Sequence, residues 1–81
     1  MASRDQFRHR AENVFREVLD DSNLHLHDDL SASDHPSWDS LNHLTLVISL
    51  EKEFKVSFST AEVMRWKNVG DILDSLISKH E

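Results

Sequence analysis

Apolar side chains recur three or four residues apart in two segments, one near each end of the chain. Residues at this spacing share one face of a helix, so each segment predicts an amphipathic helix that packs its apolar face on a common core. The first set comprises Phe7, Ala11, Val14, Phe15, Val18 and Leu19, and the last comprises Val69, Ile72, Leu73, Leu76 and Ile77.

The segment from 40 to 54 is apolar over most of its circumference rather than along one stripe. Leu44, Val47, Ile48 and Leu50 have helical spacing, and Phe54 extends the row. The apolar surface is wider than this row, because Leu41 and Leu46 lie beside it. Such a helix either lies at the centre of a core or presents part of its surface to a partner.

Capping signals predict where the helices begin. Ser3 with Gln6, and Ser59 with Glu62, have the spacing of a capping box, in which each side chain bonds the backbone N–H of the other residue. The first predicts the start of the N-terminal helix, and the second predicts a short helix. Asn68 precedes the last apolar segment and is a favoured cap residue.

Residues 22 to 38 predict a long polar loop that includes the single proline, Pro36. A loop of this length in a small domain needs anchors on the core. The alternation between residues 24 and 27 is too short to predict a paired strand. The fold class is therefore all-α: one domain, 1–81, forming a four-helix bundle of three main helices and one short helix, with a long loop between the first and second helices. The expected loop anchors are Leu24, Leu26, Leu30 and Trp38.

Composition narrows the classes of function. The chain has 81 residues, no cysteine and a formal net charge of −6. An acidic balance disfavours binding to nucleic acid or to a membrane surface, and it fits partners that present basic patches. There is no run of about 18 apolar residues, which a membrane span requires, and no apolar signal-peptide core in MASRDQFRHR. We expect a cytoplasmic monomer.

Ser40 stands where the polar loop gives way to the second helix. If Asp39 is the N-cap, Ser40 is the first helical residue, at the positive end of the helix dipole. A phosphate-linked group is stabilised at such a place. The plain alternative is that Ser40 is only part of a helix cap. Catalysis by Ser40 itself is disfavoured, because there is no G-x-S-x-G elbow and His43 has no evident third partner.

The segment DSLNHLTLVISLEKEF resembles the start of the second helix of acyl and peptidyl carrier proteins. The family signature is Asp-Ser-Leu followed by an apolar helix ending Leu-Glu-x-x-Phe, which matches 39–41 and 50–54 here. The length, the acidity, the order of the helices and the apolar pattern of the last helix agree with the family as well.

The resemblance implies a function. A phosphopantetheinyl transferase would attach 4′-phosphopantetheine from coenzyme A to Ser40, and the thiol of the arm would carry an acyl or aminoacyl group as a thioester. The carrier would not be an enzyme itself; its other partners would be a loading ligase and a downstream synthase or transferase. Asp39, Leu41, Ile48 and Glu51 match positions at which the family contacts its partners.

Several positions depart from the family's fatty-acid-synthesis members. Those carriers often have glycine shortly before the serine, where this chain has Ser37 and Trp38. Thr45 and Lys52 replace residues that are often acidic, and His43 replaces a small or apolar residue. The segment WDSLNH, residues 38–43, resembles free-standing carriers of dedicated biosynthetic pathways.

Other interpretations concern the helical surfaces and the histidines. A helical adaptor could bind partners through the apolar excess of the second helix, with Ser40 only a cap.

Met64 and Trp66 are expected in the core or at its rim, and the resemblance makes Trp66 a candidate to line an acyl groove. No zinc-site spacing connects the remaining candidates, His25, His27, His35 and His43, so we expect no metal site.

Overall fold

The computed structural model describes residues 3–80, with the backbone alone for His80. The elements are α1 (Arg4–Val18), the 3-10 helix η1 (Ala32–Asp34), α2 (Ser40–Phe54), α3 (Thr60–Arg65) and α4 (Val69–His80). Residues 3–80 contain no strand. The predicted all-α class, with three main helices and one short helix, is confirmed, and η1 is an addition within the long loop.

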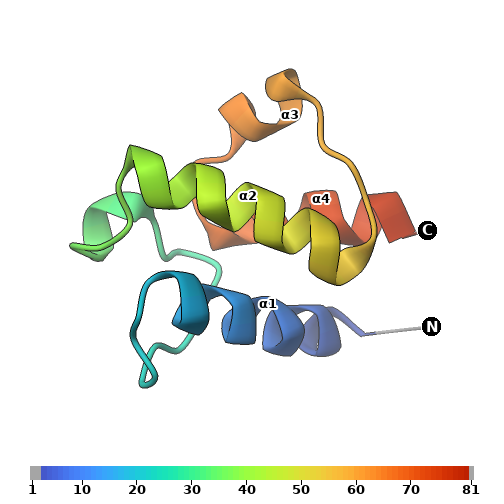
Figure 1. The fold of residues 1–81 in the computed structure, drawn as a ribbon. Helices are drawn as coiled ribbons and strands as arrows, with labels where there is room; N and C mark the ends of the chain where they lie inside the picture. The colour runs from blue at the N-terminus through green and yellow to red at the C-terminus, as the bar shows by residue number, and fades with distance from the viewer. Residues whose placement is uncertain (1–2, 81) are drawn as a thin grey trace.

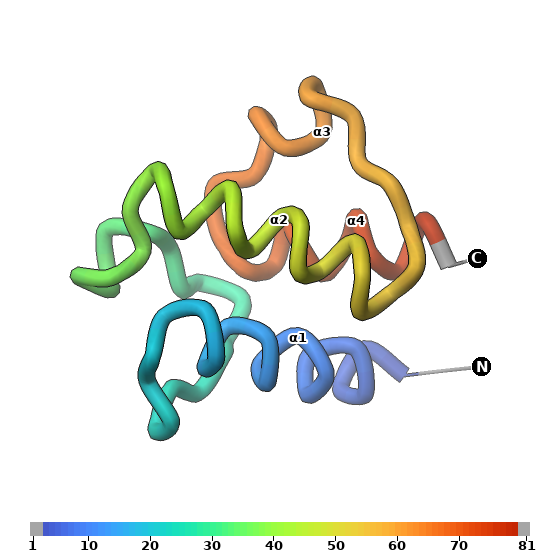
Figure 2. Tube along the Cα trace, in the orientation of Figure 1, coloured from blue at the N-terminus to red at the C-terminus, as the bar shows by residue number. Residues whose placement is uncertain are grey.

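Helix α1 packs against both α2 and α4, and the short α3 lies across α2 from α1 (Figure 1). Figure 2 shows the long loop leaving the end of α1 and reaching the start of α2 on the side opposite the first turn of α1. The beginning of α2 is therefore set by the loop rather than by a tight turn. In the described part of the chain, no helix has the length and apolar character needed to cross a membrane.

The predicted caps are confirmed. Ser3 Oγ accepts a hydrogen bond from Gln6 N at 3.2 Å, and Gln6 Oε1 accepts one from Ser3 N at 3.0 Å. Ser59 and Glu62 exchange the same pair of bonds at 3.1 and 3.2 Å. Asn68 Oδ1 accepts a bond of 3.0 Å from the first turn of α4. These bonds satisfy N–H groups that a helix start leaves free.

One cluster of buried side chains joins the three main helices and the loop. The rings of Phe7 on α1 and Phe54 on α2 stack with their centroids 5.7 Å apart. The predicted apolar faces of α1 and α4 are both in this cluster. It comprises Phe7, Ala11, Phe15, Leu19, Leu24, Leu26, Leu30, Trp38, Leu46, Leu50, Phe54, Val69, Ile72, Leu73 and Leu76.

The structure shows which side of the widely apolar helix α2 is buried. The structure buries Leu46, Leu50 and Phe54, each four residues from the next, whereas Leu44 and Ile48 are exposed. The sequence had left this choice open, because a helix that is apolar nearly all round does not reveal its inward face from spacing alone. The position of α1 decides it, since α1 covers one side of α2.

The long loop is held to the core as expected, with its four predicted anchors, Leu24, Leu26, Leu30 and Trp38, all buried. Hydrogen bonds hold its backbone as well. Leu26 N donates to Glu12 Oε2 at 2.9 Å, and Val69 N at the start of α4 donates to Leu30 O at 2.8 Å. Glu12 is itself buried and pairs with Arg16 at 3.2 Å. A buried carboxylate is stable here because it is both paired and hydrogen-bonded.

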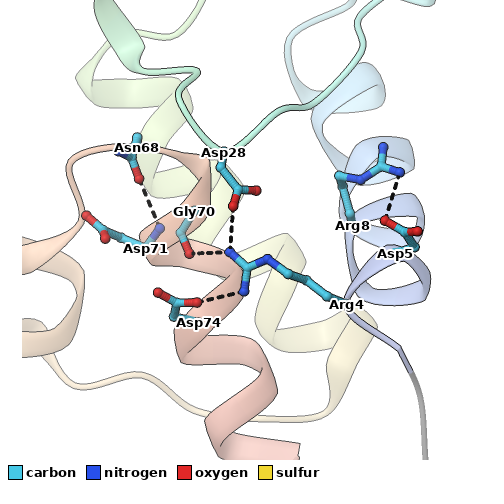
Figure 3. A network of polar contacts seen from close by, with 8 residues as sticks. All are labelled: Arg4, Asp5, Arg8, Asp28, Asn68, Gly70, Asp71 and Asp74. Atoms are coloured by element: carbon cyan, nitrogen blue, oxygen red, sulfur yellow. Dashed lines mark hydrogen bonds and ion pairs between the residues drawn. The ribbon is translucent and has the colours of Figure 1, made fainter.

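A polar clamp ties α1, the loop and α4 together (Figure 3). The guanidinium of Arg4 donates to Asp74 at 2.7 Å, to Asp28 at 3.0 Å and to the carbonyl of Gly70 at 3.3 Å. Gly70 N donates to the carbonyl of Asp28 at 3.0 Å, so α4 approaches the loop backbone closely. A Cβ at Gly70 would lie 3.2 Å from Asp28 Cβ, which explains why glycine suits this position.

Candidate functional site

Ser40 is the first residue of α2, and the residues around it fix the start of the helix. Asp39 has the extended backbone of an N-cap, and its Oδ1 accepts a hydrogen bond of 2.9 Å from Asn42 N. The carbonyl of Asp39 accepts the first helical bond, 2.8 Å long, from His43 N. Asn42 Nδ2 donates to the carbonyl of Ser37 at 2.6 Å, which holds the chain before the cap. The predicted cap by Asp39 is confirmed.

The side chain of Ser40 is exposed at the positive end of α2. Among the described residues, no acceptor bonds the backbone N–H groups of Ser40 and Leu41. Free N–H groups and the helix dipole both favour negative charge at this place. The site therefore suits a phosphate group bonded to the serine oxygen, and the hydroxyl is open to a second protein.

Trp38 fixes the chain two residues before Ser40. Its ring is 5% exposed and meets Phe15 of α1 edge-on, with centroids 5.2 Å apart. Its Nε1 donates a hydrogen bond of 3.0 Å to Nδ1 of His43 on the first turn of α2. A pocket of about 490 Å³ lies beside Ser40 and is lined by Ala32, Trp38, Asp39, Ser40 and His43. Trp38 is the loop anchor that the sequence predicted.

The bond from Trp38 sets the state of His43. The indole N–H can only donate, so Nδ1 of His43 must be unprotonated, and the proton of the neutral ring lies on Nε2. Burial lowers the pKa of His43 below its usual 6.5, which agrees with a neutral ring. Nδ1, the ring nitrogen that could accept a proton from Ser40, thus already accepts the hydrogen bond from Trp38. In catalytic triads the partner of the histidine accepts a bond, whereas Trp38 donates one. The arrangement does not support a Ser40–His43 hydrolase.

The proposed contact residues on α2 differ in exposure. Leu41 is 73% exposed, Leu44 is 61% exposed and Ile48 is 51% exposed. Glu51 is half-buried, and its Oε2 accepts a hydrogen bond of 2.9 Å from Phe58 N, so Glu51 also holds the segment between α2 and α3. No sequence pattern indicated this second role, because the bond spans seven residues through an irregular segment.

The aromatic residues near α3 were only partly anticipated. Trp66 lies at the rim, with its ring edge-on to Phe58 at 4.9 Å and its Nε1 donating to Ser75 Oγ at 2.9 Å. It also meets His43, with centroids 6.2 Å apart. Met64 is 79% exposed, so the expectation that it lies in the core or at its rim is wrong.

The histidines take part in separate contacts. His35 Nε2 lies 2.9 Å from Asp21 Oδ2, and this hydrogen bond lowers the pKa of Asp21. The ring of His25 is near Glu12 at 4.0 Å, and His43 is bonded to Trp38. Within residues 3–80, no three His, Asp or Glu side chains are grouped as a metal site would require.

Comparison with known proteins places this geometry in a family. No protein-family model and no curated protein sequence matches the chain. Among solved structures, the holo acyl carrier protein from Geobacter metallireducens is 38% identical over 99% of this chain and 87% of its own length, with a TM-score of 0.85. A protein described as an acyl carrier protein from Mycobacterium tuberculosis, 22% identical over 89% of this chain and 96% of its own, shares the fold with a TM-score of 0.80. The chain belongs to the acyl carrier protein family.

Proposed function

We propose that Ser40 carries 4′-phosphopantetheine and that the chain, acting as one carrier domain over 1–81, tethers acyl or aminoacyl groups as thioesters for partner enzymes. The observation that carries this proposal is the exposed Ser40 at the first position of α2, capped by Asp39. The family supports it, because the relative from Geobacter metallireducens is a holo carrier protein. The chain itself contributes no catalytic group.

The residues around Ser40 fit the attached group. When bound, the arm supplies the thiol that this cysteine-free chain lacks. The serine oxygen forms a phosphoester bond while the pyrophosphate bond of coenzyme A breaks and its nucleotide half leaves. A phosphopantetheinyl transferase accepts the hydroxyl proton and supplies the metal for this step. The N–H groups of Ser40 and Leu41 would stabilise the charge of the attached phosphate, while the hydrogen bond from Asn42 N to Asp39 Oδ1 keeps the helix start in place.

Partner enzymes would contact the exposed residues of α2. The expected partners are the transferase, a ligase that loads the arm, and a synthase or transferase that receives the cargo. Asp39, Leu41 and Ile48 are exposed and available for such contacts. Glu51 is also proposed as a contact, through the part of its carboxylate that Phe58 does not use. We place the carrier in the cytoplasm as a monomer.

The features that this chain adds around Ser40 favour a dedicated biosynthetic pathway over general fatty acid synthesis. Trp38 and His43 form a rigid bonded pair beside the serine, where the sequence analysis noted departures from fatty-acid carriers. Because Trp38 is buried, a client enzyme would meet the partly exposed His43 and the exposed apolar side chains of α2 beside the serine.

A helical adaptor is the second candidate, and the exposed Leu41, Leu44, Ile48 and Met64 favour it. In an adaptor these side chains would bind a partner directly and Ser40 would only begin the helix. The two functions differ in whether Ser40 is modified.

The test is the intact mass of the purified protein after incubation with coenzyme A, Mg²⁺ and a promiscuous phosphopantetheinyl transferase. Three forms are compared: wild type, Ser40→Ala, and the control Ser57→Ala, which alters another exposed serine. We expect wild type and Ser57→Ala to gain one phosphopantetheine unit and Ser40→Ala to gain none. If wild type stays unmodified with several such transferases, the tether proposal is wrong and the adaptor remains.

A further inference from the structure

The net charge is divided unevenly along the chain. Residues 40–67, which form α2, α3 and the segment between them, contain four Lys and Arg but only three Asp and Glu. The remaining residues contain five Lys and Arg and twelve Asp and Glu. The acidic character of the protein therefore belongs to the part of the sequence outside α2 and α3.

The three acidic side chains of 40–67 are all engaged. Glu53 pairs with Arg10 of α1 at 3.2 Å, and Glu62 pairs with Lys79 of α4 at 2.7 Å. The bond to Lys79 also lowers the pKa of Glu62. Glu51 accepts the hydrogen bond from Phe58 N. In the described part of the chain, the carboxylates of α2, its cap and α3 that have no cationic partner are therefore Glu51 and Asp39, fewer than the four cations of this segment.

The basic side chains of the same segment are free. In the described part of the chain, no ion pair involves the side chains of Lys52, Lys55, Arg65 or Lys67, and all four are exposed. The uncompensated charge of the α2–α3 region is therefore positive, opposite in sign to the net charge of −6.

Two of these cations adjoin exposed apolar residues along their helices, and a third follows in the chain. We name Leu41, Leu44, Ile48 and Met64 the apolar patch, and Lys52, Arg65 and Lys67 the basic rim. The first three patch residues share one face of α2, and Lys52 continues that face four residues after Ile48. Arg65 follows Met64 in the chain.

The C-terminal end of α3 is held near the first turn of α2. The ring of Trp66 lies 6.2 Å from that of His43, three residues after Ser40. Arg65 and Lys67 are the chain neighbours of Trp66, so the backbone that bears these two exposed cations lies on the side of α2 where His43 stands. A protein that reaches Ser40 must therefore approach both the apolar patch and positive charge.

A protein docked on α2 and α3 responds mainly to the charges of that surface, because salt screens charges farther away. The molecule measures 32 × 26 × 22 Å, whereas the Debye length at physiological ionic strength is about 8 Å. Charges on the far side of the molecule are therefore largely screened from a protein docked on α2 and α3. The sequence-based expectation of partners with basic patches, which followed from net charge, does not apply to this surface.

We propose that the apolar patch and basic rim form the docking surface for client enzymes, and that the matching client surface is an apolar cleft bordered by Asp and Glu carboxylates. This inference rests on the proposed carrier function and specifies the chemistry of its partner. Burial of the patch supplies affinity, and the rim supplies orientation, because complementary charges fix register more than they add binding energy.

Two synthetic amphipathic peptides with the same leucine stripe test the proposal, one with glutamates flanking the stripe and one with lysines. Each is titrated into ¹⁵N-labelled apo protein, and shifts are followed by NMR at low and physiological salt. We expect the glutamate peptide to shift resonances of the apolar patch, with an affinity that falls as salt rises. The lysine peptide should bind roughly tenfold more weakly, as three exposed ion pairs would dictate.

A charge-neutralised variant and a matched control complete the test. Lys52→Gln with Arg65→Gln and Lys67→Gln should abolish the preference for the glutamate peptide. The control, His9→Glu with Asn13→Glu and His27→Glu, lowers the net charge by the same amount at exposed positions of α1 and the loop, and should keep the preference. Equal or tighter binding of the lysine peptide, shifts confined to α1 and α4, or no shift with either peptide would overturn the proposal. Because apo protein is used, these outcomes are independent of whether Ser40 accepts the arm.

Discussion

Ile48 and Leu50 lie two residues apart on α2 and have opposite environments. The side chain of Ile48 is 51% exposed, whereas Leu50 is fully buried. Replacing each with alanine therefore separates a surface role from a core role on the same helix. The pair also tests which side of α2 is buried, a choice that the sequence left open.

The expected cost at Ile48 is small. Full burial of an isoleucine side chain contributes about 1.5–3 kcal/mol, so a half-exposed one contributes about 1 kcal/mol. Alanine has the higher helix propensity by about 0.4 kcal/mol, which offsets part of the loss. The free energy of unfolding should fall by less than about 1 kcal/mol, since solvent already reaches the site and no cavity forms.

The expected cost at Leu50 is much larger. Truncation of a buried leucine loses its transfer free energy and leaves a cavity, at about 2–5 kcal/mol. A chain of 81 residues has a total stability of about 4–12 kcal/mol, so Leu50→Ala removes a large share of it.

Urea unfolding followed by far-UV circular dichroism measures both variants, and the rate of arm transfer to Ser40 is measured on the folded proteins. We expect Ile48→Ala to slow arm transfer while staying nearly as stable as wild type. Leu50→Ala should lose stability, yet its folded fraction should accept the arm normally. A loss above about 2 kcal/mol at Ile48, or below about 1 kcal/mol at Leu50, would refute the assignment of the α2 faces.

Three further predictions test the surroundings of the site. Lowering the pH below about 6.5 should destabilise the fold, because the folded state binds fewer protons at His43 than the unfolded state, and NMR titration should show His43 and the Trp38 indole N–H changing together. A pKa of His43 at or above 6.5 would contradict the bonded pair. So would a Trp38 indole N–H resonance that does not shift as His43 titrates. Gly70→Ala should lower the unfolding free energy by about 1 kcal/mol despite the better helix propensity of alanine, since its Cβ would press on Asp28, and unchanged thermal stability would contradict this close approach. Glu12→Ala should cost about 2 kcal/mol or more, because a buried N–H loses its acceptor, and Glu12→Gln should cost less in the same thermal melts.

The helix starts could be predicted because their signals are local. The pairs Ser3–Gln6 and Ser59–Glu62 lie three residues apart and bond as the sequence suggested. The cap at Asp39 and the start of the helix at Ser40 could be predicted for the same reason. The position of Ser40 at the beginning of α2 could therefore be predicted from the sequence alone.

Contacts between distant segments could not be predicted in this way. The inward face of α2 depends on where α1 packs, and apolar residues all round the helix leave the choice open. Glu12 is a charged residue beside the buried face of α1, and its bond to the backbone of Leu26 becomes visible only when the loop is in place. The bond from Trp38 to His43 joins two residues that the sequence had marked separately, with no signal that linked them.

The most direct measurement is the mass of the protein as it exists in the cells that naturally produce it. The chain would be isolated intact, its mass determined, and the modified residue located by fragmentation. We predict a phosphopantetheine unit, free or carrying an acyl or aminoacyl group, on Ser40. A mass equal to that of the bare sequence, or an arm on another residue, would contradict the assignment of Ser40 as the tethering residue.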